Sequence, residues 1–132
     1  MGAIKYLLDT HTFLWAVRGS DKLSKTSLEI LENPKAQIFV SAISAYEIMN
    51  KHRLGKLAEF DDVVENYDDL LRKLGTEVLP LSNNHAHYAG KLDWIHRDPF
   101  DRILASQAHL ENLVLITNDQ AFNSLSWLKC IW

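Results

Sequence analysis

The sequence is poor in the residues that build several common kinds of site. It contains one cysteine, Cys130, which excludes an intrachain disulfide framework and a zinc site made of cysteine thiolates. Its five glycines form neither a GxG nor a GxxxxGK[ST] motif, so the glycine-rich loops that hold nucleotide phosphates are absent. No HExxH motif occurs, and His85 and His87 would point apart on a helix, which disfavours a histidine-based zinc site.

The chain also lacks an excess of one charge and a long apolar run. Its 14 basic and 17 acidic residues give a net charge of −3, so no global basic field marks a nucleic-acid-binding protein, although a local patch is sufficient for binding. No apolar run approaches the ~18 residues of a membrane span. Lys5 and Asp9 interrupt the N-terminal apolar residues where a signal peptide has its apolar region. We therefore expect a cytoplasmic protein without membrane contact.

The composition and the apolar runs indicate one α/β domain that covers residues 1–132. The chain is 47% hydrophobic and 23% charged, as is usual for a globular domain of 132 residues. Four short apolar runs are typical of buried strands, and they do not alternate with polar residues. These predicted strands are Ile4–Leu8, Ile38–Val40, Val78–Leu81 and Leu113–Ile116.

Amphipathic segments separate the predicted strands. Asp61–Leu74 carries apolar residues at helical spacing, and Pro99 stands where a helix begins. Strands that alternate with helices predict a mainly parallel central sheet between two helical layers, an α/β/α arrangement. In such sheets the functional site lies beyond the carboxyl ends of the strands.

Acidic residues follow the predicted strands at that edge. Asp9 closes the first strand, Asp119 comes just after the strand "LVLIT", and Glu47 lies early in the helix after "IFVS". Asp101 lies in the first turn of the helix that Pro99 opens. If these carboxylates gather, their repulsion favours either bound protons or a bound cation. An all-oxygen cluster suits a hard ion, Mg²⁺ or Mn²⁺.

Each acid also has a purely structural interpretation. Asp9 and Asp119 are suitable N-caps, Asp98 before Pro99 is another, and Ser44 with Glu47 forms a capping-box pattern. Independent caps have no reason to gather at one edge of a sheet, so the conjunction favours a cation site. A phosphatase of the haloacid-dehalogenase type is disfavoured, because it needs a second Asp where this chain has His11.

Four motifs, in this order and spacing, resemble the PIN domain, specifically the VapC-like ribonuclease toxins of bacterial toxin–antitoxin pairs. They are "LLDTHTFLW", "SAISAYEI", "HRDPFDRILASQA" and "LVLITNDQAF". The third, HxDPFDR before an alanine-rich helix, is typical of one subgroup. Two departures from that subgroup, Asp93 in place of a proline and "LASQA" in place of "LIAQA", leave the acids untouched.

The resemblance implies a metal-dependent endoribonuclease that cleaves RNA phosphodiester bonds and is neutralised by a cognate antitoxin. By that resemblance Asp9, Glu47, Asp101 and Asp119 are the catalytic, metal-binding acids for Mg²⁺ or Mn²⁺, and Asp98 is a supporting acid that caps its helix. Family members are usually dimers, so a homodimer is expected. Two alternatives remain: a PIN-type nuclease that acts on DNA, and a non-catalytic PIN interaction module. Such modules typically lose one or more of the acids, whereas all four are present here.

Polar and basic residues near the acids supply further candidates. The hydroxyls of Thr10 and Thr117 are placed to hydrogen-bond carboxylates or a water on the metal. Basic residues after Glu47 and around the acidic turn are candidates for contact with RNA phosphates. These basic residues are Lys51, Arg53, Arg97 and Arg102.

Overall fold

A computed structural model describes residues 4–132, and its strands form one five-stranded sheet. The strand order is β3-β2-β1-β4-β5, and every neighbouring pair is parallel. The strands are β1 (Lys5–Leu8), β2 (Gln37–Ser41), β3 (Glu77–Leu79), β4 (Val114–Ile116) and β5 (Cys130–Ile131). The chain extends the sheet from β1 through β2 to β3, and then returns to the other side of β1 with β4 and β5. The order therefore reverses between β1 and β4, which is where parallel sheets bind ligands.

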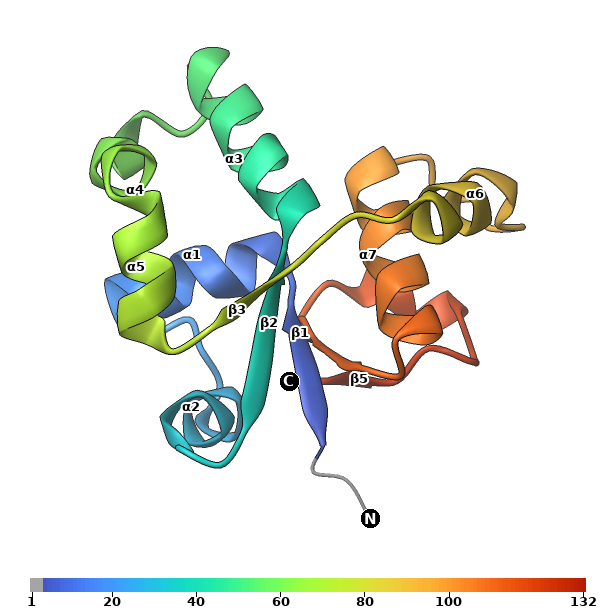
Figure 1. Ribbon diagram of the computed structural model, residues 1–132, viewed down its shortest axis with the longest axis horizontal. Coiled ribbons are helices and arrows are strands. Elements are labelled where there is room, and N and C mark those ends of the chain that lie inside the picture. The colour runs from blue at the N-terminus through green and yellow to red at the C-terminus, as the bar shows by residue number, and fades with distance from the viewer. Residues whose placement is uncertain (1–3) are drawn as a thin grey trace.

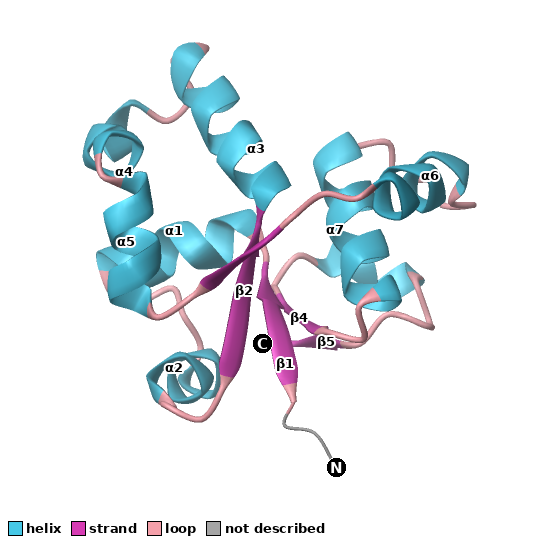
Figure 2. Ribbon diagram, viewed as in Figure 1, coloured by secondary structure: helices cyan, strands magenta, loops and turns pink. Residues whose placement is uncertain are grey.

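Helices cover both faces of the sheet, so the predicted three-layer α/β/α arrangement is confirmed (Figure 1; Figure 2). One layer holds α1 to α5, and the other holds α6 and α7. Two 3₁₀ segments, Ala58–Phe60 and Gln120–Ser124, complete the regular structure. Among residues 4–132 no helix is both long enough and apolar enough to cross a membrane. The helices are α1 (Thr10–Arg18), α2 (Lys25–Glu32), α3 (Ala42–Arg53), α4 (Asp61–Glu65), α5 (Tyr67–Leu74), α6 (Asn83–Lys91) and α7 (Pro99–Leu110).

Successive residues of the central strands serve two separate cores. Leu7 of β1 packs in the cluster that includes Leu104 of α7, whereas Leu8 packs with Phe13 of α1. The side chains of a strand alternate between its faces, so a strand covered by helices on both sides is apolar at every position. Burial of each of these side chains contributes about 1.5–3 kcal/mol to the free energy of unfolding. The two cores hold β1 rigidly in the centre and fix the position of the residue that follows it.

Two expectations about the elements were wrong in detail, and one strand was missed. The third strand was expected at Val78–Leu81 but spans Glu77–Leu79, because Pro80 has no N–H to donate to a neighbouring strand. The single helix expected at Asp61–Leu74 is divided into α4 and α5 at Asn66, whose φ of −119° and ψ of 26° are not helical. The two-residue strand β5 was not predicted, since so short a segment shows no periodicity.

Candidate functional site

Asp9 follows β1 directly and has two structural partners. As the N-cap of α1, it accepts a 2.7 Å hydrogen bond at Oδ1 from the backbone N–H of Thr10. Its Oδ2 accepts a second bond, also 2.7 Å, from the hydroxyl of Thr117. The side chain is buried, and this burial, reinforced by the charge of Glu47, raises the pKa of Asp9 despite both hydrogen bonds. Asp9 thus caps α1 and at the same time belongs to a group of interacting acids.

Thr117 connects Asp9 to the next acid along the edge of the sheet. It follows β4, and its Oγ1 accepts a 3.0 Å hydrogen bond from the backbone N–H of Asp119 while it donates to Asp9. Asp119 is exposed and is the N-cap of the 3₁₀ segment, where its Oδ1 accepts from Ala121 N at 2.9 Å. The hydroxyl of Thr117 therefore fixes Asp9, which follows β1, relative to Asp119, which lies shortly after β4.

Glu47 reaches the same edge from α3. The hydroxyl of Thr10 donates to Glu47 Oε1 at 2.7 Å and lies 2.9 Å from the hydroxyl of Ser44. The other carboxylate oxygen pairs with the ammonium group of Lys51, one turn further along the helix. The Ser44–Glu47 capping-box interpretation was wrong, because Ser41 is the N-cap of α3 and Ser44 lies inside the helix.

Asp98 and Asp101 lie at the start of α7, together with a histidine. Asp98 is the N-cap and accepts from the backbone N–H groups of Phe100 at 2.9 Å and Asp101 at 3.3 Å. Asp101 Oδ2 lies 2.7 Å from Nε2 of His96. One ligand atom from each of His96, Asp98 and Asp101 lies within 4.8 Å of the others. Among residues 4–132, this is the group of potential metal ligands that is already this close together.

The acids influence one another electrostatically. Burial raises the pKa of Asp101 to about 6, and the charges of Asp98, Asp9 and Asp119 contribute to the rise, against the lowering effect of His96. Glu47 acts in the same direction on Asp9. The carboxylates thus form a chain of mutually repelling groups at the carboxyl edge of the sheet. A bound cation relieves this repulsion, and the oxygen donors match the preference of Mg²⁺ or Mn²⁺.

The predicted basic residues differ in their surroundings. Arg97 and Arg53 are exposed, and Arg53 donates to Asn50 Oδ1 at 2.5 Å. The guanidinium of Arg102, by contrast, donates to four backbone carbonyls, those of Ala89, Leu92, Trp94 and His96. Arg102 therefore anchors the loop between α6 and α7, and its guanidinium is engaged with carbonyls and not available for contact with RNA phosphates.

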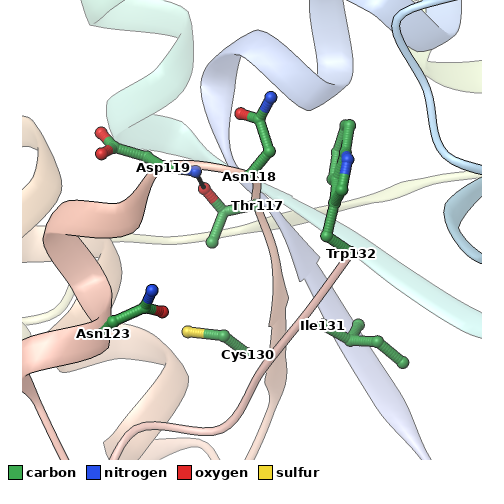
Figure 3. A pocket seen from close by; sticks show the side chains of 7 residues that line it. All are labelled: Thr117, Asn118, Asp119, Asn123, Cys130, Ile131 and Trp132. Atoms are coloured by element: carbon green, nitrogen blue, oxygen red, sulfur yellow. Dashed lines mark hydrogen bonds between the residues drawn. The ribbon is translucent and has the colours of Figure 1, made fainter.

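A hollow of about 230 Å³ adjoins Asp119 and was not predicted from the sequence (Figure 3). It lies beside the ends of β4 and β5, and Asn118, Asn123, Cys130 and Trp132 contribute to its lining. Two asparagines close to Asp119 in "TNDQAFN" were the available signal. That these asparagines line a hollow could not be inferred without β5, which brings Cys130 and Trp132 next to them.

This chain is similar to known proteins in sequence and in fold. Over 60 residues, 46% of this chain, it is 40% identical to Ribonuclease VapC16 of Mycobacterium tuberculosis, and the match covers only 41% of that relative. The structure of VapBC2 from Rickettsia felis bound to a DNA fragment from their promoter is similar with a TM-score of 0.69, at 22% identity over 97% of this chain and 98% of that one. A toxin–antitoxin complex from Klebsiella pneumoniae is similar with a TM-score of 0.61, at 17% identity over 96% of both chains.

The sequence as a whole matches a defined family. Residues 6–128 match the PIN domain, and this range includes Asp9, Glu47, Asp101 and Asp119. The match therefore spans the edge of the sheet where these acids lie and not only the surrounding scaffold. The chain belongs to the PIN domain family.

Proposed function

We propose that this protein is a metal-dependent endoribonuclease, a toxin held inactive by a cognate antitoxin. The observation that carries the proposal is the chain of repelling carboxylates from Asp9, Glu47, Asp101 and Asp119 at the switch point of the sheet. Buried acids of like charge are unfavourable unless protons or a cation compensate them. The 40% identity to Ribonuclease VapC16 supports RNA as the substrate class.

The donor set fits Mg²⁺ or Mn²⁺. Carboxylate oxygens are the ligands these ions prefer, and burial together with the neighbouring acids raises the pKa of Asp101 to about 6, against the lowering effect of His96. A bound ion would supply charge stabilisation at a scissile phosphate and lower the pKa of an attacking water. Asp9, Asp101 and Asp119 would hold it, with Glu47 completing the site.

The surrounding residues orient these carboxylates. Thr117 orients Asp9 through Oδ2, and Thr10 orients Glu47 through Oε1, while Oδ1 of Asp9 caps α1 and Oε2 of Glu47 pairs with Lys51. Asp98 supports the site by fixing the first turn of α7, which carries Asp101. Arg97 and Arg53 are exposed and provide positive charge for the phosphates of an RNA strand.

The proposed partner is an antitoxin, since the similar structure from Klebsiella pneumoniae is a toxin–antitoxin complex. We also propose that the toxin is a homodimer, in line with the family resemblance. Sedimentation equilibrium of the purified protein tests the dimer, and titration with the product of the adjacent gene tests inhibition. An antitoxin that binds should stop cleavage at a one-to-one ratio of sites.

The deciding experiment compares labelled single-stranded RNA with DNA of the same sequence. We expect cleavage of the RNA in Mg²⁺ or Mn²⁺, none after EDTA, and recovery when the metal is restored. Asp9→Asn should abolish cleavage while the protein remains folded, and expression of the wild type, but not of this variant, should arrest growth. Metal-independent cleavage would refute the mechanism.

The two alternatives predict different results in the same assay. Cleavage of DNA but not RNA would identify a PIN-type deoxyribonuclease. Cleavage of neither, together with tight binding to the antitoxin, would identify a non-catalytic interaction module.

A further inference from the structure

The hollow beside Asp119 has a chemically distinctive lining. Amides from Asn118 and Asn123, the thiol of Cys130 and the indole of Trp132 contribute to it, and Asp119 is its one charged residue. Burial, followed by the charge of Asp9, raises the pKa of the Cys130 thiol to about 11, so the thiol is neutral near pH 7. A phosphate would find no lysine or arginine in this lining and would be repelled by Asp119. The lining therefore suits a neutral, planar, polar group.

The two amides are available to a ligand. Within residues 4–132, neither side chain takes part in a hydrogen bond with another residue, whereas the backbone of neighbouring Asp119 is fixed by Thr117. An amide offers both a donor and an acceptor, which is the pattern on the edges of nucleobases. In Figure 3 Asp119, Asn118 and Trp132 lie in the upper part of the group of lining residues, and Asn123 and Cys130 lie below them.

An aromatic row continues from the hollow toward α1. The rings of Trp132 and Trp15 lie 5.7 Å apart, and those of Trp15 and His11 lie 5.9 Å apart. His11 lies close enough to Asp9 to lower its pKa. Aromatic side chains beside a phosphate-cleaving site are typical platforms for the bases of single-stranded nucleic acid.

The size of the hollow limits its occupant. Its volume of about 230 Å³ is below the roughly 300–1,000 Å³ of pockets that enclose whole drug-sized ligands. It therefore has room for one base but not for the attached sugar and phosphate as well.

We propose that this hollow is a base-binding subsite, which takes one nucleobase adjacent to the scissile phosphate of the RNA and sets the base preference of cleavage. Asn118 and Asn123 read the edge of the base, and Trp132 contacts its face. The inference rests on the proposed ribonuclease function and adds a specificity determinant to it.

The test measures kcat/KM for single-stranded RNAs that differ only in the bases flanking one cut. We expect the wild type to prefer one base at one of these positions by about tenfold or more, the discrimination given by a matched amide. Asn123→Ala should reduce this ratio to below about threefold, and Cys130→Met should do the same by filling the hollow. Because the readout is a ratio between substrates, a general loss of activity does not imitate it.

The matched control is Asn66→Ala. Asn66 lines a hollow of about 240 Å³ on α4 and α5, whose other lining residues include Asp62 and Lys73 and none of the four site acids. The substitution removes an asparagine amide, which donates to the carbonyl of Asp62 at 2.9 Å, from a hollow of similar size, so the base ratio should stay that of the wild type. An unchanged ratio in Asn123→Ala, or an equal change in Asn66→Ala, would overturn the inference.

A second readout does not require cleavage. Nuclear magnetic resonance of the protein titrated with each of the four ribonucleosides, which carry no phosphate, should shift the side-chain amide signals of Asn118 and Asn123 and the indole N–H of Trp132. Larger shifts for one ribonucleoside than for the other three, in a protein that cuts no RNA, would refute the proposed function but support the subsite. Cleavage of RNA with no such shift for any ribonucleoside would refute the subsite alone.

Discussion

Thr117 and Asp9 lie 108 positions apart in the sequence, yet the hydroxyl of Thr117 donates a 2.7 Å hydrogen bond to Oδ2 of Asp9. The same hydroxyl accepts from the backbone N–H of Asp119. These residues follow β1 and β4, the neighbouring strands between which the strand order reverses. The hydrogen bond therefore orients an acidic side chain at the point where a parallel sheet binds its ligand.

Replacing Thr117 tests this orientation. Thr117→Val keeps the shape of the side chain but leaves Oδ2 of Asp9 and the N–H of Asp119 without their partner. We expect about a 10- to 100-fold loss of Mn²⁺ affinity or of metal-dependent cleavage, as is usual when a group that orients a ligand is removed. The free energy of unfolding should fall by about 1–3 kcal/mol. Isothermal titration with Mn²⁺ and urea denaturation measure the two effects.

Thr12→Val is the matched control. Thr12 is also a buried threonine at the start of α1, but its hydroxyl donates to the carbonyl of Ile116 at 2.9 Å and not to a carboxylate. This variant should lose a similar amount of stability and keep the Mn²⁺ affinity of the wild type. Equal losses of Mn²⁺ affinity in both variants would show that Thr117 acts through the fold and not through Asp9.

The raised pKa of Asp101 predicts a pH-dependent stability of the metal-free protein. The folded-state pKa of about 6 exceeds the ordinary 3.8, so the folded protein binds the proton more tightly than the unfolded chain. The ionised carboxylate thus lowers stability at and above about pH 6, and this penalty disappears as the pH falls toward 4. Burial is the main cause, and the charges of Asp98, Asp9 and Asp119 add to it.

Asp101→Asn should therefore stabilise the metal-free protein at neutral pH. We expect a gain of about 1–3 kcal/mol at pH 7.5 and little gain at pH 4, because the raised pKa of Asp101 already includes the lowering effect of its hydrogen bond with His96. The same variant should lose metal binding and cleavage together. Urea denaturation in EDTA at both pH values measures the gain. Equal effects at the two pH values would show that the Asp101 charge carries no penalty in the fold.

The edge of the sheet was predictable because the ends of the strands and the positions of the acids are both local signals. Apolar runs without alternation indicated strands buried on both faces, and Asp9 and Asp119 could be placed beyond their carboxyl ends from the sequence alone. The partners of these acids were harder to predict. The hydrogen bond from Thr10 to Glu47 depends on the approach of α1 to α3, which no pattern within either segment records. The hollow beside Asp119 depends on β5, a strand of two residues.

Arg102 shows the opposite limit of sequence reasoning. An arginine next to Asp101 suggests a phosphate-binding residue, but its guanidinium donates to the carbonyl of Ala89 in α6 and to three carbonyls of the loop after α6. The loop from Leu92 to Asp98 has no regular structure, so its sequence gives no sign that its carbonyls require a donor. Only the path of that loop, which turns its carbonyls inward, identifies the role of the arginine.

Substitutions of Asp98 distinguish its role as the N-cap of α7 from the role of its negative charge. Asp98→Asn retains an excellent N-cap for α7, so stability should change by a few tenths of a kcal/mol, whereas Asp98→Ala should lose about 1 kcal/mol. If Asp98 only supports α7, Asp98→Asn keeps most of the cleavage activity. A loss of Mn²⁺ affinity comparable to that of Asp101→Asn would instead place Asp98 among the metal ligands, together with His96 within 4.8 Å.

Arg97 and Arg102 should respond differently to removal of their charge. Arg102→Ala leaves four carbonyls without a donor and should destabilise the fold by about 2–4 kcal/mol. Arg97→Ala removes an exposed side chain, so stability should be unchanged while RNA affinity falls and its dependence on salt becomes less steep by about one unit. Thermal denaturation and RNA binding at several salt concentrations distinguish the two. Weaker RNA binding by Arg102→Ala with unchanged stability would contradict this assignment.

Lys51 provides the last prediction, because its ammonium pairs with a carboxylate that the site is proposed to offer to a metal. Glu47 is buried and Lys51 only partly so, so the pair compensates the charge of Glu47 when no ion is bound. Lys51→Met leaves that carboxylate without its partner, which should destabilise the metal-free protein by about 1–3 kcal/mol. The same change removes a competitor for Glu47, so Mn²⁺ should bind several-fold more tightly and restore most of the lost stability.

Arg53→Met is the control for this variant, since Arg53 lies on the same helix and hydrogen-bonds Asn50 rather than a carboxylate. It should leave both Mn²⁺ affinity and metal-free stability near those of the wild type. Thermal denaturation of both variants in EDTA and in Mn²⁺ separates the outcomes. If Lys51→Met instead binds Mn²⁺ normally but shows a raised KM for RNA and a shallower salt dependence, Lys51 contacts the phosphates of the substrate, as the sequence predicted. The ion pair with Glu47 would then be a resting position of a substrate-binding side chain.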